Sequence, residues 1–126
     1  MRRRSVVILI LVIILAGCSV KNEINTYQKI TQDEAWRRMK NHEVVILDVR
    51  EKDEFEESHI AGAVLLPVGT ITKDTAAAVI PDFDTEVLVY CRSGNRSQTA
   101  SSALVSLGYS NVYEFGGINT WPYEVE

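Results

Sequence analysis

The stretch VYCRSGNRS, residues Val89–Ser97, places Cys91 directly after an apolar run and directly before a polar loop. The run Glu86–Tyr90 is short, aliphatic and rich in β-branched residues, which is typical of a strand buried on both faces of a sheet. After the loop, apolar residues recur at helical spacing as far as Leu107, and Gly108 follows as the expected end of a helix. Cys91 is therefore expected where a strand ends and a helix starts.

Strands and helices are also expected to alternate on both sides of this stretch. Thr31–Glu34 has the form of a capping box, in which Thr31 accepts from the amide three residues on and Glu34 reaches back, and it predicts a helix through Met39. The other expected elements are strands at 44–47, 63–66 and 111–114, helices at 51–57 and 70–80, and a last helix carrying Trp121. This alternation predicts an α/β fold with a mostly parallel central sheet and helices on both faces.

The length of the chain fits one domain. Of its 126 residues, 46% are hydrophobic and 24% are charged, which allows a single core of modest size. We expect residues 30–126 to form this domain, as a monomer. Residues 18–29 are mostly polar without periodicity and are expected to be a tether.

The start of the chain has the pattern of a secretion signal. Three arginines follow Met1, the run Val6–Leu15 is continuously apolar, and small residues lead to Cys18. The apolar run is shorter than the about 20 residues that a membrane-spanning helix needs, which favours a signal peptide over residues 1–17. The segment Leu15–Cys18, LAGC, resembles the lipobox of bacterial lipoproteins, in which the cysteine is acylated and becomes the first residue after cleavage.

The lipobox resemblance implies an extracytoplasmic protein that lipid on Cys18, such as palmitate, anchors to a bacterial membrane. A short uncleaved membrane anchor is the alternative. Cleavage removes three arginines and no acid, so the formal charge of −4 becomes −7, from 10 basic and 17 acidic residues. This charge argues against a nucleic-acid partner. Lipidation also leaves Cys91 without a disulfide partner, so its thiol is either buried and inert or reactive.

The loop that follows Cys91 is suited to binding an anion. Gly94 permits a positive φ, so that successive amides can converge, and the next helix adds its N-terminal amides and dipole. Ser97 is expected to be the N-cap of that helix. These dipoles, together with Arg92 and Arg96, favour the thiolate, so the cysteine needs no neighbouring histidine as a base.

Four segments, in order along the chain, resemble the motifs of the single-domain rhodanese sulfurtransferases. They are LDVRE at 47–51, SHIAGA at 58–63, the loop CRSGNRS at 91–97, and GGI with Trp121 at 116–121. The resemblance implies a rhodanese-like fold and a persulfide relay on Cys91. In that relay the thiolate takes sulfane sulfur from an anionic donor such as thiosulfate, sulfite leaves, and the sulfur passes to cyanide or a thiol, protein thiols included. We expect no cofactor and no metal.

The resemblance also suggests roles for residues outside the loop. Asp48 resembles a strand-end carboxylate that supports the active-site loop, with a surface cap on the next helix as an equal alternative. Arg50 is expected to pair with an acid such as Glu54 or Glu57. His59 is expected to pack and to form hydrogen bonds rather than to catalyse.

Loop amides are expected to stabilise the anionic sulfur, and Arg92 or Arg96 to hold the donor's oxyanion. The predicted site comprises Cys91 as the catalytic residue, the loop residues Arg92, Ser93, Gly94, Asn95, Arg96 and Ser97, and the supporting residues Asp48, Arg50 and His59.

Two other functions stay open. Dual-specificity phosphatases of the cell-cycle type resemble rhodaneses in fold, but their loop is one residue longer than the six residues of Cys91–Arg96, and they carry a histidine where Tyr90 stands. Phosphatase or arsenate reductase activity is therefore a minor hypothesis. The other possibility is a persulfide carrier or binding module without turnover of its own.

Overall fold

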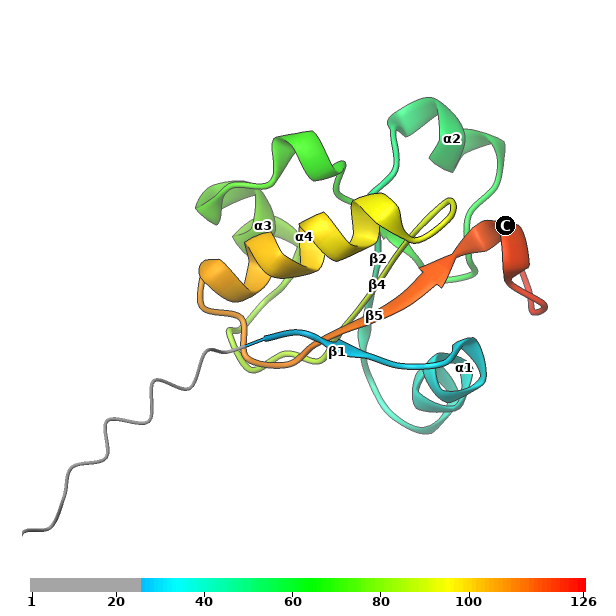
Figure 1. The fold of residues 1–126 in the computed structure, drawn as a ribbon, viewed down its shortest axis with the longest axis horizontal. Coiled ribbons are helices and arrows are strands. Elements are labelled where there is room, and N and C mark those ends of the chain that lie inside the picture. The colour runs from blue at the N-terminus through cyan, green and yellow to red at the C-terminus, as the bar shows by residue number, and fades with distance from the viewer. Residues whose placement is uncertain (1–25) are drawn as a thin grey trace, which may run out of the picture.

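Five parallel strands in the order β1-β5-β4-β2-β3 form the centre of the structure (Figure 1). This computed structural model describes residues 26–126 of the chain. The strands are β1 (Gln28–Lys29), β2 (Val45–Asp48), β3 (Val64–Leu65), β4 (Val87–Cys91) and β5 (Val112–Gly117). The middle strand, β4, is buried at every residue, as expected of a strand covered on both faces. The predicted α/β fold with a parallel sheet is confirmed.

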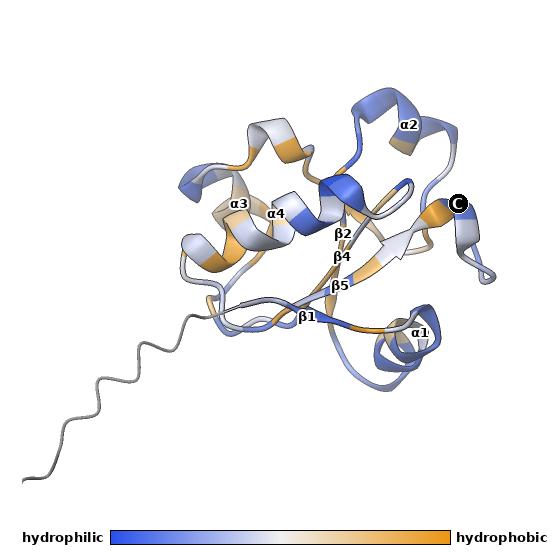
Figure 2. Ribbon diagram, in the orientation of Figure 1, coloured by the Kyte–Doolittle hydropathy of each residue, from blue (hydrophilic) through white to orange (hydrophobic). Residues whose placement is uncertain are grey.

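Helices cover both faces of this sheet. They are α1 (Gln32–Asn41), α2 (Lys52–Glu57), α3 (Lys73–Val79) and α4 (Asn95–Ser106), with single 3₁₀ turns η1 (Val68–Thr70) and η2 (Ile118–Thr120). The helices α3 and α4 lie on one side of the sheet and α1 lies on the other (Figure 1). Figure 2 shows the apolar character of the central strands and the largely hydrophilic surface of α2. No helix within residues 26–126 is long and apolar enough to cross a membrane.

The two faces of β4 enter two separate hydrophobic clusters. Successive side chains of a strand point to opposite faces. Val87, Val89 and Cys91 therefore join the cluster under α3 and α4. Leu88 and Tyr90 join the cluster on the α1 side. Cys91 thus emerges beside the first turn of α4, and Tyr90 emerges on the other face.

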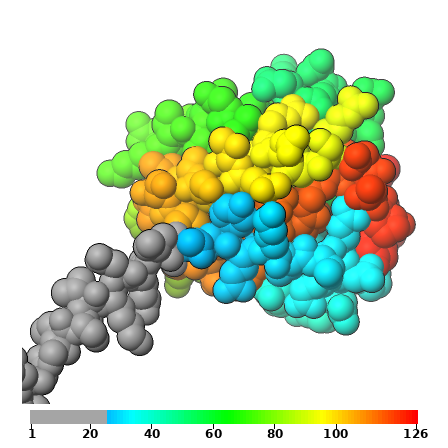
Figure 3. All heavy atoms as spheres, viewed as in Figure 1, coloured from blue at the N-terminus to red at the C-terminus, as the bar shows by residue number. Residues whose placement is uncertain are grey.

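The C-terminal segment closes the α1 side of the molecule. In Figure 3 this segment, in red, lies against α1, in cyan. Trp36 of α1 stacks on Tyr123 with ring centroids 4.6 Å apart, and Trp121 packs against Phe115 of β5. Trp121 is half-buried and packs against the hydrophobic cluster on the α1 side. It follows a single 3₁₀ turn, however, and the predicted last helix is wrong, because the chain after Thr120 becomes extended.

The start of the domain differs from the prediction in two details. Gln28 and Lys29, which we assigned to the tether, pair with β5 as an edge strand. Thr31 accepts from the amide of Glu34 at 3.1 Å, as predicted, and caps α1. The Glu34 carboxylate does not reach back. It accepts instead from Arg38 at 3.1 Å, one turn further along the same helix.

The predicted helix at 70–80 is shorter and starts later. Thr70 closes the 3₁₀ turn η1, and α3 begins only at Lys73. Thr72 caps α3 and forms a reciprocal pair of hydrogen bonds with Thr75, which fixes the start of the helix there.

Candidate active site

Cys91 is the last residue of β4, and the motif loop turns directly into α4. Its side chain is only 1% exposed. The amide of Gly94 donates to Sγ at 3.0 Å, and the thiol donates to the Ser97 hydroxyl at 3.3 Å. Gly94 has φ of +102°, which allows the loop to curl back over the sulfur. The sulfur therefore lies on the inner side of the loop, among groups that can donate to it.

These donors act on the acidity of the thiol. Burial alone would raise the pKa of Cys91, but the hydrogen bond shared with the Ser97 hydroxyl and those with the amides of Ser97, Gly94 and Ser93 outweigh it. The pKa of Cys91 therefore lies below its ordinary value, which favours the nucleophilic thiolate.

Ser97 is not the N-cap of α4, and this prediction is wrong. The left-handed turn at Gly94 lets the helix begin at Asn95, so Gly94 takes the cap position. Ser97 then lies in the first helical turn, fully buried, with its hydroxyl facing inward. Besides its contact with Cys91, that hydroxyl donates to Glu114 Oε1 at 2.7 Å.

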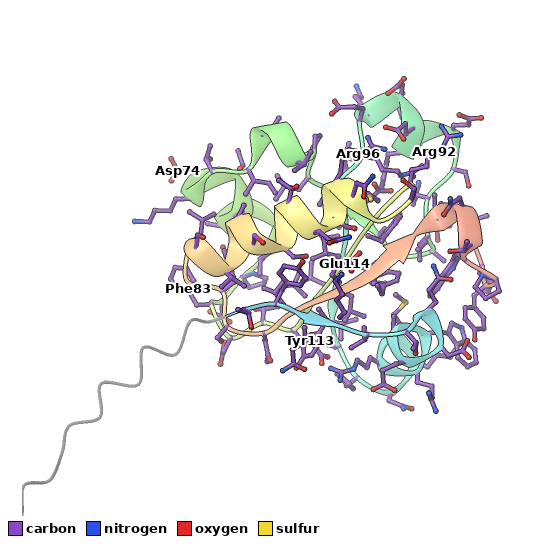
Figure 4. All side chains as sticks on the ribbon, in the orientation of Figure 1. Asp74, Phe83, Arg92, Arg96, Tyr113 and Glu114 are labelled. Atoms are coloured by element: carbon purple, nitrogen blue, oxygen red, sulfur yellow. The ribbon has the colours of Figure 1, made fainter. Side chains whose placement is uncertain are left out.

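Sequence reasoning missed Glu114. This β5 carboxylate is 4% exposed and also accepts from the amide of Gly116 at 2.8 Å. Figure 4 places it between β5 and α4. An acid two residues after Val112, within the apolar alternation of a strand, is the signal that could have identified it.

Arg96 does not lie free beside the sulfur. Its guanidinium donates to both carboxylate oxygens of Glu54 on α2, at 2.6 and 2.9 Å. This contact lowers the pKa of Glu54 to about 2, against the opposing effect of burial. Arg92 is exposed, and among residues 26–126 no side-chain partner is found for its guanidinium. Both arginines lie at the end of α4 nearest α2 (Figure 4), and Arg92 is the more exposed of the two.

Asp48 is fully buried, so a surface cap is the wrong interpretation of it. Arg50 donates to both oxygens of this carboxylate, with Nη2 at 2.7 Å from Oδ2. The expected ion pair of Arg50 with an acid is present, but the partner is Asp48 rather than Glu54 or Glu57, since the side chain folds back onto its own strand end. The hydroxyl of Tyr90 also donates to Asp48, at 2.5 Å, and Tyr90 directly precedes Cys91. Asp48 thus supports the strand that carries the cysteine.

His59 has the packing and hydrogen-bonding contacts that we expected. Its ring stacks on Phe55 with centroids 3.8 Å apart, and Nδ1 donates to the carbonyl of Phe55 at 2.9 Å. Nε2 lies 3.3 Å from the carboxylate of Glu126. The other histidine among residues 26–126, His42, is exposed and pairs with Glu86.

Gly117 fixes the motif loop from the side of β5. It lies opposite Cys91 in the sheet, where the register between β4 and β5 shifts. A Cβ atom at Gly117 would lie 2.0 Å from the carbonyl oxygen of Arg92. That oxygen accepts from the amide of Asn119 at 3.2 Å. The segment Gly116–Ile118 is therefore a support for the loop as well as a turn.

The hollow beside α1 is separate from the motif loop. The hollow beside α1 is lined by Trp36, Ile60, Trp121 and Tyr123, together with neighbouring residues, and includes no residue of the motif loop. Among residues 26–126, no cluster of three His, Cys, Asp or Glu side chains could hold a metal ion.

Comparison with known proteins agrees with this geometry. Residues 31–123 match the family described as the rhodanese-like domain. The chain belongs to this family. The rhodanese-like domain is 40% identical to the thiosulfate sulfurtransferase GlpE of Coxiella burnetii over 96 residues, which cover 75% of this chain and 87% of that protein. It is 33% identical to the thiosulfate sulfurtransferase PspE of Escherichia coli over 72 residues, 57% of this chain and 68% of that one.

A solved structure of a rhodanese with anions from E. coli superposes with a TM-score of 0.62 at 28% identity. The match covers 67% of this chain and 98% of that one. The rhodanese resemblance predicted from the four motifs is therefore confirmed. Cys18 and the predicted signal peptide at 1–17 lie outside the described residues and stay predictions.

Proposed function

We propose that this rhodanese-like domain is an enzyme of the thiosulfate sulfurtransferase type that works through a persulfide on Cys91. The observation that carries the proposal is the inner side of the motif loop. There, the Gly94 amide donates to Sγ and the Ser97 hydroxyl is in contact with it, and the pKa of the thiol is lowered. The relatives named as thiosulfate sulfurtransferases support the choice of sulfur as the group transferred.

The loading step requires no external base, oxidant or cofactor. The Cys91 thiolate donates an electron pair to the sulfane sulfur of thiosulfate, and a new S–S bond forms. The S–S bond of thiosulfate breaks, and its electron pair leaves with sulfite. One thiolate and one dianion become one persulfide anion and one dianion, so charge balances. The loop amides that faced the thiolate are suited to stabilise the persulfide as well.

The second step returns the enzyme to its thiolate form. An acceptor nucleophile, cyanide or a thiolate, attacks the outer sulfur of the persulfide. The S–S bond breaks, and its electron pair returns to Cys91 Sγ, which leaves as a thiolate. A leaving thiolate of low basicity departs faster, so the lowered pKa of Cys91 assists this step.

Arg92 is the residue that we propose for attracting the donor. The chain carries a formal charge of −4, or −7 without residues 1–17, which opposes the approach of a dianion. Arg92 is exposed next to Cys91, whereas the charge of Arg96 is offset by Glu54. A single exposed guanidinium beside the nucleophile gives the donor a local positive site.

For location, we propose an extracytoplasmic protein anchored to a bacterial membrane through lipid on Cys18. The support is the sequence alone: the basic start, the short apolar run and the LAGC segment that ends at Cys18. Labelling cells with a palmitate analogue tests it. Wild type should be labelled and Cys18→Ala should not, and equal labelling of the two would refute the anchor.

The test of the transfer reaction uses purified residues 22–126. After treatment with thiosulfate, mass spectrometry should find the mass of one added sulfur atom on wild type and none on Cys91→Ser. With cyanide present, wild type should form thiocyanate. An enzyme that gains the sulfur but forms thiocyanate no faster than Cys91→Ser would be the persulfide carrier. Release of phosphate from aryl phosphates faster than sulfur transfer would favour the phosphatase.

A further inference from the structure

Glu114 is a buried carboxylate without a basic partner. Its side chain is 4% exposed, and within residues 26–126 no Lys, Arg or His nitrogen lies within 4.0 Å of its oxygens. Its donors are the hydroxyl of Ser97 and the amide of Gly116, both to Oε1. A buried carboxylate that is not paired loses hydration without regaining it from a cation. Packing alone therefore does not explain a carboxylate at this position.

The neighbour that links Glu114 to the reaction is Ser97. Its hydroxyl lies 3.3 Å from Cys91 Sγ and 2.7 Å from Glu114 Oε1, and it is fully buried. A hydroxyl has one proton to donate and can accept from other groups. While Cys91 is a thiol, the three groups form one chain of hydrogen bonds, since the thiol donates to Ser97 and Ser97 donates to Glu114. Once Cys91 is a thiolate, two anions require the same proton.

We propose that Glu114 is a positioning residue that competes with the Cys91 thiolate for the hydroxyl proton of Ser97. The competition makes the free thiolate more basic and more nucleophilic than the motif loop alone would make it. Glu114 itself touches no reacting atom, and its effect on the sulfur passes through Ser97.

The same competition favours the persulfide form of Cys91 over the thiolate. This step rests on the proposed function. When Cys91 attacks thiosulfate, its own sulfur becomes neutral and the negative charge moves to the outer sulfur, about 2 Å further along the new bond. Ser97 and Glu114 are both buried, so the donor approaches from the opposite side and the charge moves away from Glu114. Ser97 can then donate to Glu114 without a rival. Conversion of thiolate to persulfide thus relieves the conflict.

The charged groups nearest to Ser97 and Glu114 are bonded to other side chains or exposed to solvent. Lys29 of β1 is in register with Glu114, but its amine lies 3.4 Å from the side chain of Gln98. Arg96 on α4 is paired with Glu54 of α2, so their charges largely offset each other at the sulfur. Arg92 is exposed to solvent, which weakens its field.

The experiment compares the pH dependence of alkylation of Cys91 by iodoacetamide, a neutral reagent, in wild type and Glu114→Gln. The amide can still accept from Ser97 but carries no charge. We expect Glu114→Gln to react about three- to tenfold faster than wild type at acidic pH, because removal of a like charge favours the thiolate. At alkaline pH it should react more slowly than wild type, because a less basic thiolate is a weaker nucleophile. The two profiles should cross.

Two controls separate this role from general effects. Glu56→Gln removes an exposed acid of α2 whose carboxylate lies 3.5 Å from the amine of Lys52, and its profile should match wild type. In a Ser97→Ala background the effect of Glu114→Gln should be largely lost, because the shared hydroxyl is gone. Equal effects with and without Ser97, or profiles of wild type and Glu114→Gln that do not cross, would overturn the proposal.

A second variant keeps the test decisive if Glu114→Gln does not fold. Glu114→Asp retains the charge, and its shorter carboxylate can still accept from the amide two residues on, but it no longer reaches Ser97. Its alkylation at acidic pH should lie between those of wild type and Glu114→Gln. A rate equal to that of wild type would refute the role of Ser97 as the link.

The persulfide itself provides the last measurement. This measurement uses a fixed ratio of thiosulfate to sulfite at alkaline pH. The ratio of persulfide to free thiolate in Glu114→Gln should be lower than in wild type, by the factor by which its alkylation is faster at acidic pH. An unchanged ratio would refute the competition in the loaded state. Absence of persulfide on wild type would instead refute the proposed function, while the alkylation profiles would still decide whether Glu114 acts on Cys91.

Discussion

The ion pair between Glu54 and Arg96 makes a quantitative prediction about stability. The hydrogen bonds from Arg96 lower the pKa of Glu54 from an ordinary 4.5 to about 2. Taken at about 1.4 kcal/mol for each pH unit, this difference corresponds to about 3 kcal/mol. The side chains of Glu54 and Arg96 are 23% and 33% exposed, so screening by solvent reduces the contribution to about 1–2 kcal/mol.

The perturbation is Glu54→Gln, which keeps the shape of the side chain and removes its charge. At pH 7 we expect the free energy of unfolding to fall by about 1–2 kcal/mol, and the melting temperature to fall by about 4–8 °C for each kcal/mol. A group whose pKa is lowered by folding stabilises the protein above its unfolded pKa and loses that effect as the pH falls through the folded value. The difference between variant and wild type should therefore shrink below about pH 4.5 and vanish only below about pH 2.

The assay is urea unfolding followed by circular dichroism at a series of pH values. Glu56→Gln is the matched control, because its carboxylate is 64% exposed and its partner Lys52 is 78% exposed. This control should change stability by less than about 0.5 kcal/mol. A destabilisation by Glu54→Gln that stays the same from pH 7 to pH 2 would refute the electrostatic reasoning, because a packing defect does not depend on pH.

Two further predictions concern the support of the motif loop and the strand that carries it. Gly117→Ala should lower stability by about 1–3 kcal/mol and reduce sulfur transfer, because the new methyl group displaces the carbonyl of Arg92; thermal melts and thiocyanate formation measure both. Full sulfur-transfer activity in Gly117→Ala would contradict this prediction. Tyr90→Phe should lower the free energy of unfolding by about 1–3 kcal/mol, because it leaves the amide of Ile60 and one bond of Asp48 unsatisfied. Its transfer rate should change less than that of Gly117→Ala.

Glu54→Gln should also change the KM for thiosulfate. The released Arg96 becomes available to the anionic donor, so the KM for thiosulfate should fall relative to wild type, and more salt should reverse the gain. A KM that is unchanged at low salt would show that Arg96 does not face the donor.

The sequence predicts those features that depend on neighbouring residues. The buried strand before Cys91, the positive φ of Gly94 and the helix end at Gly108 all follow from local patterns, and the structure has them. The four motifs also identify the family. Each of these features can be predicted from a few consecutive residues, because the period of apolar residues and the turn-forming residues are local patterns.

The polar contacts of the site could not be predicted in the same way. Arg96 meets Glu54 across 42 residues of sequence, and Ser97 meets Glu114 across 17. Such pairs depend on the order of strands and on where α4 starts, which a single sequence does not specify. The start of α4 is an example: the cap lies three residues earlier than predicted, at Gly94, so Ser97 is a buried partner of the sulfur instead of the N-cap.

The end of β4 is held on both faces by buried carboxylates, and the two act differently. On one face, Asp48 accepts from Tyr90 and is neutralised by the two-point contact with Arg50, so its charge is compensated and its effect is structural. On the other face, Glu114 meets Cys91 through a single hydroxyl and has no basic partner among residues 26–126.

A charge that is compensated fixes geometry, whereas one that is not compensated also responds to the charge of its neighbour. Replacement of Asp48 by Asn should therefore change stability without making the alkylation profile cross that of wild type, and replacement of Glu114 by Gln should make the profiles cross. If both variants altered the profile alike, the asymmetry between the two faces of β4 would have no functional meaning.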